Sequence, residues 1–254
     1  MVDIIPIPAF QDNYIWCISD GRHAAVVDPG DAAPVLEFLQ REHLTLTAIL
    51  ATHHHADHVG GIASLLESYP VPVYGPGDGT IPQVTDPVAE GDEVMLAAPE
   101  IALEILEIPG HTPGHIAYYG VNRLFCGDTL FACGCGRLFG GTPEQMTASL
   151  QRLAELPGGT LVYCAHEYTL SNIRFARTVD PDNPALADRE RRDRKLREQG
   201  LPTVPSSIAV ERMTNPFLRC HLSEIAEAAS RAEGRPLPEP VAVFAALREW
   251  KNRF

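Results

Sequence analysis

A short segment of this sequence gathers several side chains that can bind a metal ion. Within six residues it contains His53, His55, Asp57 and His58. The apolar run 46–51 before it suits a buried strand, and the run 60–69 after it has apolar residues at helical spacing. Because successive side chains of an extended turn point to opposite sides, His53 and His55 should face one way and His54 the other. Asp57 and His58 can then reach a second point nearby, which favours two adjacent cations.

Three further residues of ligand type occur later in the sequence. Each follows a strand-like run: His111, Asp128 and His166. Loops at strand ends are where a rigid sheet can hold ligands accurately. Any one of the three alone would fit an ordinary loop residue, and a histidine-rich run can be an adventitious metal-binding tract. The order of all seven residues is more specific than any part of it and favours a metal centre.

Composition narrows the class of protein. The chain has 254 residues and a formal net charge of −13, which argues against nucleic acid as a partner because phosphate binding needs a basic surface. No transmembrane run or signal peptide is evident, so a cytoplasmic protein is expected. The six cysteines show no zinc-ribbon pairing and no secretory context, so they are expected to be reduced thiols. The Cys133-Gly134-Cys135 spacing is shorter than that of a structural zinc site.

The elements that must position these residues change in type along the chain. Strand-like runs are expected at 4–7, 14–19, 24–28, 71–74, 116–119, 123–126 and 161–164. Asp31 should cap one helix, and Thr142-Pro143-Glu144-Gln145 should start another. Helices joined by proline-rich links are expected at 172–179, 185–198, 222–232 and 241–253. The sequence therefore predicts an α/β domain at 1–168 and a smaller helical domain at 169–254.

Taken together, these patterns resemble the metallo-β-lactamase superfamily, and within it the hydroxyacylglutathione hydrolase (glyoxalase II) family. The resemblance covers essentially the whole chain. The superfamily pattern lies in Thr52–Gly61, Gly110–His115, Gly127–Phe131 and His166–Thr169. Narrower similarity, typical of the thioesterase branch, lies in Cys133–Arg137, Thr203–Ser206, Asn215–Arg219 and Leu247–Lys251.

The resemblance implies an αββα metallo-β-lactamase sandwich with a C-terminal helical domain and a binuclear metal centre. In that centre His53, His55 and His111 would bind one cation. Asp57, His58 and His166 would bind the other, and Asp128 would bridge the two. The implied metals are most simply zinc, with iron or manganese as alternatives. Asp57 and Asp128 would be the catalytic carboxylates, and Asp57 would orient the attacking water.

The implied reaction is hydrolysis of S-(2-hydroxyacyl)glutathione, typically S-D-lactoylglutathione, to glutathione and D-lactate in methylglyoxal detoxification. A thiolate can leave near neutral pH without a dedicated general acid. The resemblance places Arg137, Tyr168, Arg248 and Lys251 around glutathione. Without it, Arg248 and Lys251 would be read as cations that favour a helix C-terminus. Phe139 departs from the family, which often has Tyr there, so one hydroxyl contact to glutathione would be lost.

Other functions are compatible with parts of the pattern. The first alternative is an oxidoreductase of the same superfamily with a single iron, such as a glutathione persulfide dioxygenase. The second is a metal-binding or interaction protein without catalysis, which the complete ligand set disfavours. His115 is expected to be structural rather than a ligand. The protein is expected to act as a monomer on a small molecule, without a nucleic-acid or membrane partner.

Overall fold

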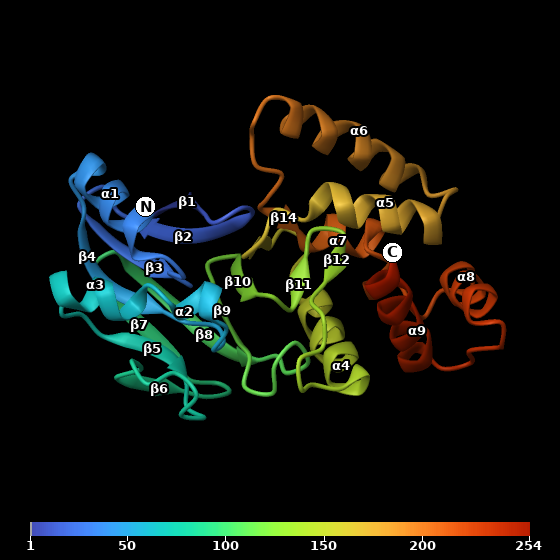
Figure 1. Cartoon of the computed structure of the whole chain (residues 1–254), viewed down its shortest axis with the longest axis horizontal. Coiled ribbons are helices and arrows are strands. Elements are labelled where there is room, and N and C mark those ends of the chain that lie inside the picture. The colour runs from blue at the N-terminus through green and yellow to red at the C-terminus, as the bar shows by residue number, and fades with distance from the viewer. Residues whose placement is uncertain (1) are drawn as a thin grey trace. The chain divides into compact units, whose positions relative to one another are not determined.

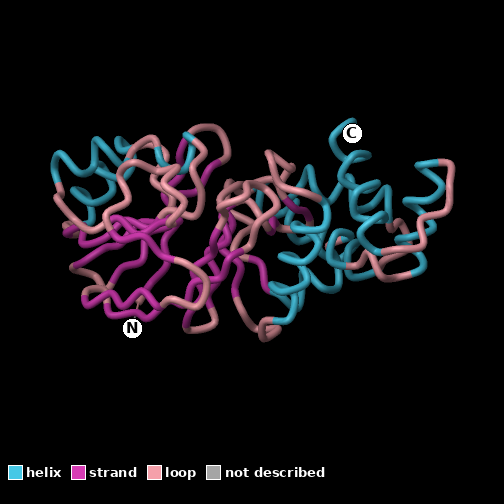
Figure 2. Tube along the Cα trace, turned by 90° about the horizontal axis from the view of Figure 1, so that it is seen from below, coloured by secondary structure: helices cyan, strands magenta, loops and turns pink. Residues whose placement is uncertain are grey.

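The computed structural model describes residues 2–254, which group into two compact units (Figure 1). The first unit contains the chain up to Glu107 together with Gly114–Gly127. The second contains Ile108–Pro113 and Asp128–Phe254. Strands predominate in the first unit and helices in the second (Figure 2). These units group residues by contact, and the predicted domain boundary after residue 168 stays a prediction.

The first unit begins with a six-stranded mixed sheet. Its strands, in spatial order, are β1 (Asp3–Ala9), β2 (Asn13–Ser19), β3 (His23–Val27), β4 (Thr45–Leu50), β5 (Val73–Pro76) and β6 (Asp86–Val88). The pairs β1–β2 and β2–β3 are antiparallel, and β3 to β6 run parallel. The parallel strands are linked by α1 (Ala32–Glu42), α2 (Ala56–Val59) and α3 (Ile62–Ser68). The β4 strand is central, so its C-terminal end is a rigid support for the loop that follows.

The first unit also contains four antiparallel strands of a second sheet. They are β7 (Glu93–Ala97), β8 (Glu100–Glu107), β9 (Ile116–Gly120) and β10 (Arg123–Gly127). The hydroxyl of Tyr118 on β9 donates to the Ala51 carbonyl just after β4, at 2.9 Å. Thr47 on β4 donates to the Ala98 carbonyl between β7 and β8. These contacts join the two sheets.

The β2 strand is largely apolar because it is covered on both faces in the core of the first unit. Every residue of β2 is buried. Ile15 and Cys17 belong to the cluster that α1 and α3 cover, and that cluster includes Phe38 and Leu65. The intervening Trp16 and Ile18 are also buried, so both faces of the strand are covered.

The second unit is built mainly from helices. Its helices are α4 (Pro143–Glu155), α5 (Thr169–Val179), α6 (Pro184–Glu198), α7 (Ile208–Thr214), α8 (Ser223–Glu233), α9 (Pro240–Arg253) and the short 3₁₀ helix η1 (Pro216–Leu218). Its strands are β11 (Leu130–Phe131), β12 (Gly134–Cys135), β13 (Leu161–Cys164) and β14 (Ser206–Ser207). No helix within residues 2–254 is long and apolar enough to cross a bilayer.

The predicted helix starts are confirmed in detail. The Asp31 side chain accepts from the Ala33 N–H at the start of α1. Thr142 and Gln145 form a reciprocal capping box at the start of α4, with Pro143 at the first helical position. The helix predicted at 60–69 is confirmed as α3, and the short helix α2 precedes it from Ala56. Asp57 and His58 lie on α2, where the chain turns from the extended segment toward α3.

Candidate metal centre and adjoining cavity

The first unit holds the histidine-rich segment at the end of β4. His53 and His58 are almost fully buried, with 0% and 1% of their surface exposed. The ring centroid of His53 lies 4.1 Å from that of His58 and 4.7 Å from that of His55. The His54 centroid is farther away, at 6.5 Å. The arrangement agrees with the prediction that His53 and His55 share a side and His54 faces elsewhere.

Asp28, at the end of β3, orients the imidazole of His58. Its Oδ2 lies 3.0 Å from His58 Nδ1, and it also accepts the Thr52 hydroxyl at 2.7 Å. Because a carboxylate only accepts, His58 Nδ1 carries a proton and Nε2 has the lone pair for a metal. The nearest ligand atoms of Asp28, His53 and His58 all lie within 4.8 Å of one another.

Gly30 allows this close approach of two loops. A Cβ atom at Gly30 would lie 1.8 Å from the Asp57 carbonyl oxygen, so any side chain would push the loops apart. The loop after β3 and the start of α2 can therefore touch, which brings Asp28 to His58. Asp28 is the last residue of the strand predicted at 24–28, and nothing in the sequence indicated that it would contribute to the site.

Asp57 is held by a neighbour outside its own loop. Its Oδ2 accepts from Asn13 Nδ2 at 3.1 Å and lies 3.5 Å from His58 Nε2. Asn13 is buried at the start of β2. This contact fixes one carboxylate oxygen of Asp57 beside the imidazole nitrogen that has the lone pair. Asn13 was not among the residues predicted from the sequence to contribute to the site.

The second unit brings together the other three predicted ligands. Asp128 Oδ2 lies 3.6 Å from His111 Nε2, and its Oδ1 lies 3.3 Å from His166 Nε2. All three side chains are buried, and Asp128 is the most exposed of them at 7%. Each oxygen of the Asp128 carboxylate thus faces a different imidazole, as a bridging ligand requires.

Two contacts orient the imidazoles of the second unit. His111 Nδ1 lies 2.8 Å from the Arg137 carbonyl oxygen, so Nδ1 is the protonated nitrogen and Nε2 faces Asp128. The ring of His166 stacks on Tyr168, with centroids 4.7 Å apart and an interplanar angle of 5°. A Cβ at Gly136 would lie 2.0 Å from the Asp128 carbonyl oxygen and 3.0 Å from His111 Nδ1, so this position needs glycine.

The donor atoms in both units suit a divalent transition metal. Buried imidazoles held by a second hydrogen bond, together with carboxylates, are the ligands used for zinc, iron and manganese. The cysteines are not part of this set. All six are free and buried, and burial raises the pKa of Cys133 to about 12, so its thiol stays protonated. His115 stacks on His53 and has its Nδ1 3.0 Å from the Ile116 carbonyl, as expected of a structural residue.

A cavity of about 610 Å³ lies within the second unit beside His111 and Asp128. All the residues predicted to contact glutathione line it: Arg137, Tyr168, Arg248 and Lys251. Arg174 adds a further cation, and Asp128 is the sole acidic side chain among the described residues that line this space. The cavity is therefore electropositive within a protein whose formal net charge is −13.

The cations of the cavity differ in how they are held. Arg248 is only 4% exposed and donates from Nη1 to the Cys135 carbonyl at 2.8 Å. Lys251 lies with its Nζ 5.2 Å from the Phe175 ring centroid. Burial, together with the charge of Arg248, lowers the pKa of Lys251 to about 8. Arg137 is exposed. Phe139, half-exposed at 53%, packs edge-on against His111.

Comparison with known proteins gives consistent matches over the whole chain. Residues 10–166 match the family described as the metallo-beta-lactamase superfamily, and residues 167–254 match the hydroxyacylglutathione hydrolase C-terminus. A curated protein of Nitrosomonas europaea named hydroxyacylglutathione hydrolase is 56% identical, over 100% of this chain and 97% of its own length.

Solved structures share the fold. ETHE1 from Myxococcus xanthus has a TM-score of 0.67 and 28% identity, over 99% of this chain and 98% of its own. A protein solved in a di-iron-bound form has a TM-score of 0.60 and 28% identity, over 85% of this chain and 100% of its own. The Nitrosomonas europaea hydrolase, at 56% identity, therefore has twice the sequence identity of these two solved structures, at 28% each.

Proposed function

The chain belongs to the hydroxyacylglutathione hydrolase family of the metallo-β-lactamase superfamily, and on that premise we propose that it hydrolyses S-(2-hydroxyacyl)glutathione thioesters. S-D-lactoylglutathione is the expected substrate, with glutathione and D-lactate as products. The observation that carries the proposal is the electropositive cavity beside His111 and Asp128. An anionic thioester bound there would have its carbonyl next to buried metal-ligand side chains.

We assign His53, His55 and His111 to one cation and Asp57, His58 and His166 to the other, with Asp128 shared. The donor chemistry within each unit and the family resemblance support this assignment. When bound, the two cations would lower the pKa of a water and polarise the thioester carbonyl. Zinc suits these ligands, as do iron and manganese. A structural relative was solved in a di-iron-bound form.

The carboxylates would direct the water. Asp57 is fixed by Asn13, so its oxygen can accept a hydrogen bond from the attacking water and aim it at the carbonyl carbon. The two oxygens of Asp128 face His111 and His166 separately, which suits a shared ligand. Attack breaks the C–S bond and releases glutathione as a thiolate. Since a thiol pKa is near 8.5, this leaving group needs no general acid.

The cavity cations would bind the glutathione part of the substrate. Glutathione carries two carboxylates and one ammonium group, so charge favours its entry among Arg137, Arg248 and Lys251. Lys251 and exposed Arg137 are available for direct contact. Buried Arg248 already donates to the Cys135 carbonyl, so it would support the cavity wall as well as attract the substrate.

The direct test is loss of thioester absorbance with purified, metal-loaded protein and S-D-lactoylglutathione. We expect turnover at nanomolar enzyme, and no turnover at micromolar enzyme would contradict the proposal. The double variant Arg248→Ala, Lys251→Ala should raise KM more than it lowers kcat if these groups bind substrate and transition state equally. An unchanged KM would remove them from the site.

The oxidoreductase alternative makes a different prediction. A mononuclear iron dioxygenase would contain one iron per chain and would consume oxygen with glutathione persulfide. The curated relatives compared, at 51% to 57% identity, carry the hydrolase name and favour hydrolysis. Oxygen uptake measured with the persulfide should therefore stay at background while the thioester is hydrolysed.

A further inference from the structure

The β11–β12 hairpin has a turn that its own backbone does not favour. Leu130 pairs with Cys135 and Phe131 with Gly134, which leaves Ala132 and Cys133 as the turn. Cys133 has a φ of 58°, in the left-handed region that residues with side chains rarely adopt. Because this conformation is costly for a residue with a side chain, contacts from outside the hairpin would help to hold the turn.

Three buried side chains, two from α7 and α5 and one from the residue that links α7 to η1, hold the polar groups of the turn. Glu211 Oε2, on α7, accepts from the Cys133 N–H at 2.8 Å. Asn215 Nδ2 donates to the Gly134 carbonyl at 2.9 Å, and Asn172 Nδ2, on α5, donates to the Ala132 carbonyl at 2.9 Å. Glu211 and Asn215 are both 0% exposed, so no solvent competes with these bonds.

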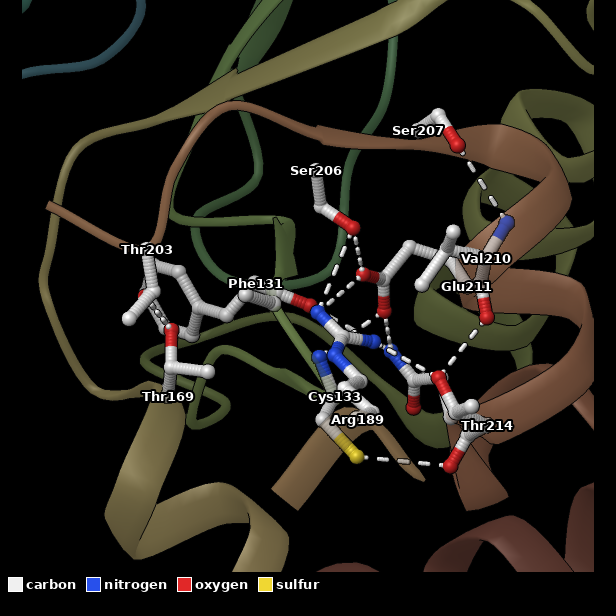
Figure 3. A network of polar contacts seen from close by, with 12 residues as sticks. Phe131, Cys133, Thr169, Arg189, Thr203, Ser206, Ser207, Val210, Glu211 and Thr214 are labelled. Atoms are coloured by element: carbon white, nitrogen blue, oxygen red, sulfur yellow. Dashed lines mark hydrogen bonds and ion pairs between the residues drawn. The ribbon is translucent and has the colours of Figure 1, made fainter. Parts of the chain in front are cut away.

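Glu211 is itself fixed by a buried polar network (Figure 3). Its Oε1 lies 2.7 Å from Arg189 Nη2 and accepts the Ser206 hydroxyl at 2.5 Å. Arg189 also donates to the Thr214 hydroxyl at 2.6 Å. Burial would lower the pKa of Arg189, but the charge and hydrogen bond of Glu211 act together with other neighbours, including Asp193, to hold that pKa above its ordinary value. Oε1 of Glu211 therefore contacts Arg189, and Oε2 accepts from the Cys133 N–H of the hairpin.

The hairpin forms part of the cavity wall. Phe131, Cys135, Gly136 and Arg137 all line the cavity, and Asp128 comes just before β11. The carbonyl of Cys135, on β12, accepts a hydrogen bond from Arg248. We propose that Glu211 is a positioning residue, which fixes the Cys133 turn and thereby the hairpin wall against which the thioester substrate binds. This inference rests on the proposed function for its effect on catalysis.

Asp193 provides a matched control for Glu211. Both carboxylates are 0% exposed and both pair with Arg189, Asp193 through Arg189 Nε at 3.3 Å. Asp193 lies on α6 and pairs with Arg189 and Arg192 rather than with the hairpin. Glu211→Gln and Asp193→Asn therefore each remove one charged partner of Arg189, while only the first acts on the turn. Glutamine has one acceptor oxygen and cannot hold both Arg189 and Cys133.

The experiment compares steady-state kinetics of the two variants in the full-length, metal-loaded protein. We expect Glu211→Gln to raise KM for S-D-lactoylglutathione by about tenfold with kcat within about threefold, and Asp193→Asn to leave KM within about twofold. Equal KM values for both variants, whether raised or unchanged, would overturn the inference. If Glu211→Gln does not fold, Glu211→Asp replaces it. This variant keeps a negative charge beside Arg189, but its shorter side chain withdraws from the Cys133 N–H. The same rise in KM, about tenfold, is then expected.

A second readout separates this inference from the proposed function. Hydrogen exchange of the 129–137 segment reports the turn directly, whether or not the thioester is a substrate. Glu211→Gln should speed exchange of the Cys133 amide and Asp193→Asn should not. Wild-type protein without thioesterase activity would refute the proposed function alone. Unchanged exchange in Glu211→Gln would refute the positioning role alone.

Discussion

At the scale of single residues, the candidate centre depends on atoms that hold the ligands rather than on the ligands alone. His58 and His111 each use Nδ1 for a hydrogen bond, to Asp28 and to the Arg137 carbonyl. Such bonds fix the tautomer and the direction of the ring, and their loss usually weakens metal binding. The ligand types were predictable from sequence because they are chemically distinctive. Asp28 was not, because an aspartate at a strand end has many ordinary uses.

Asp28→Ala should lower the affinity for the metal near His58 by about 10- to 100-fold. The imidazole would lose the acceptor that keeps Nδ1 protonated, and the Thr52 hydroxyl would lose the carboxylate to which it donates. Competition with a chromophoric chelator measures the affinity. Asp31→Ala is the control, since Asp31 caps α1 and should cost about 1 kcal/mol of unfolding free energy without weakening metal binding. Equal metal affinity in the two variants would contradict the role of Asp28.

Lys251 should give substrate binding an alkaline limit. Its pKa is lowered to about 8, first by burial and then by Arg248, so the amine is charged below about pH 8 and neutral above it. A substrate carboxylate is attracted only by the charged form, and kcat/KM should therefore fall as pH rises through about 8. Lys251→Arg stays charged and should move this limb to higher pH. An identical alkaline limb in the variant would assign the titration to another group.

At the scale of elements, strand ends and tight loops bring the side chains together. The sequence predicted ligands after strand-like runs, and β4, β10 and β13 end where those residues begin. The capping box of α4 was also predictable, because it is a local pattern. The β11–β12 hairpin and α7 were missed. Each is too short for periodicity to reveal, and the hairpin turn depends on Glu211, which is remote in sequence.

Gly136→Ala should disturb the loop that follows β12. A Cβ there would meet the Asp128 carbonyl at 2.0 Å, and backbone cannot yield as a side chain can. Displacement of Asp128 relative to His111 should lower kcat by about tenfold or more, since small misplacements of reacting groups are costly. Gly159→Ala is the control, because its Cβ would meet nothing within 4 Å. Wild-type turnover in Gly136→Ala would show that the close approach is not needed.

At the scale of the whole molecule, charge and burial account for the choice of substrate. The net charge of −13 would repel an anion, yet the second unit has a cavity lined by cations next to buried ligand residues. The family resemblance identified the cations from sequence. Their spacing alone did not, because Arg248 and Lys251 near a helix C-terminus are ordinary. The extent of the cavity and the burial of Arg248 needed the folded chain.

We propose that a pair of cations, held by the seven predicted ligand side chains, serves thioester hydrolysis. The most direct measurement is elemental analysis and S-D-lactoylglutathione turnover on the same purified sample, before and after chelation. We expect about two divalent ions per chain, loss of turnover when they are removed, and recovery when they are restored. Folded protein that holds two ions and leaves the thioester intact, or that hydrolyses it equally well without them, would contradict the account.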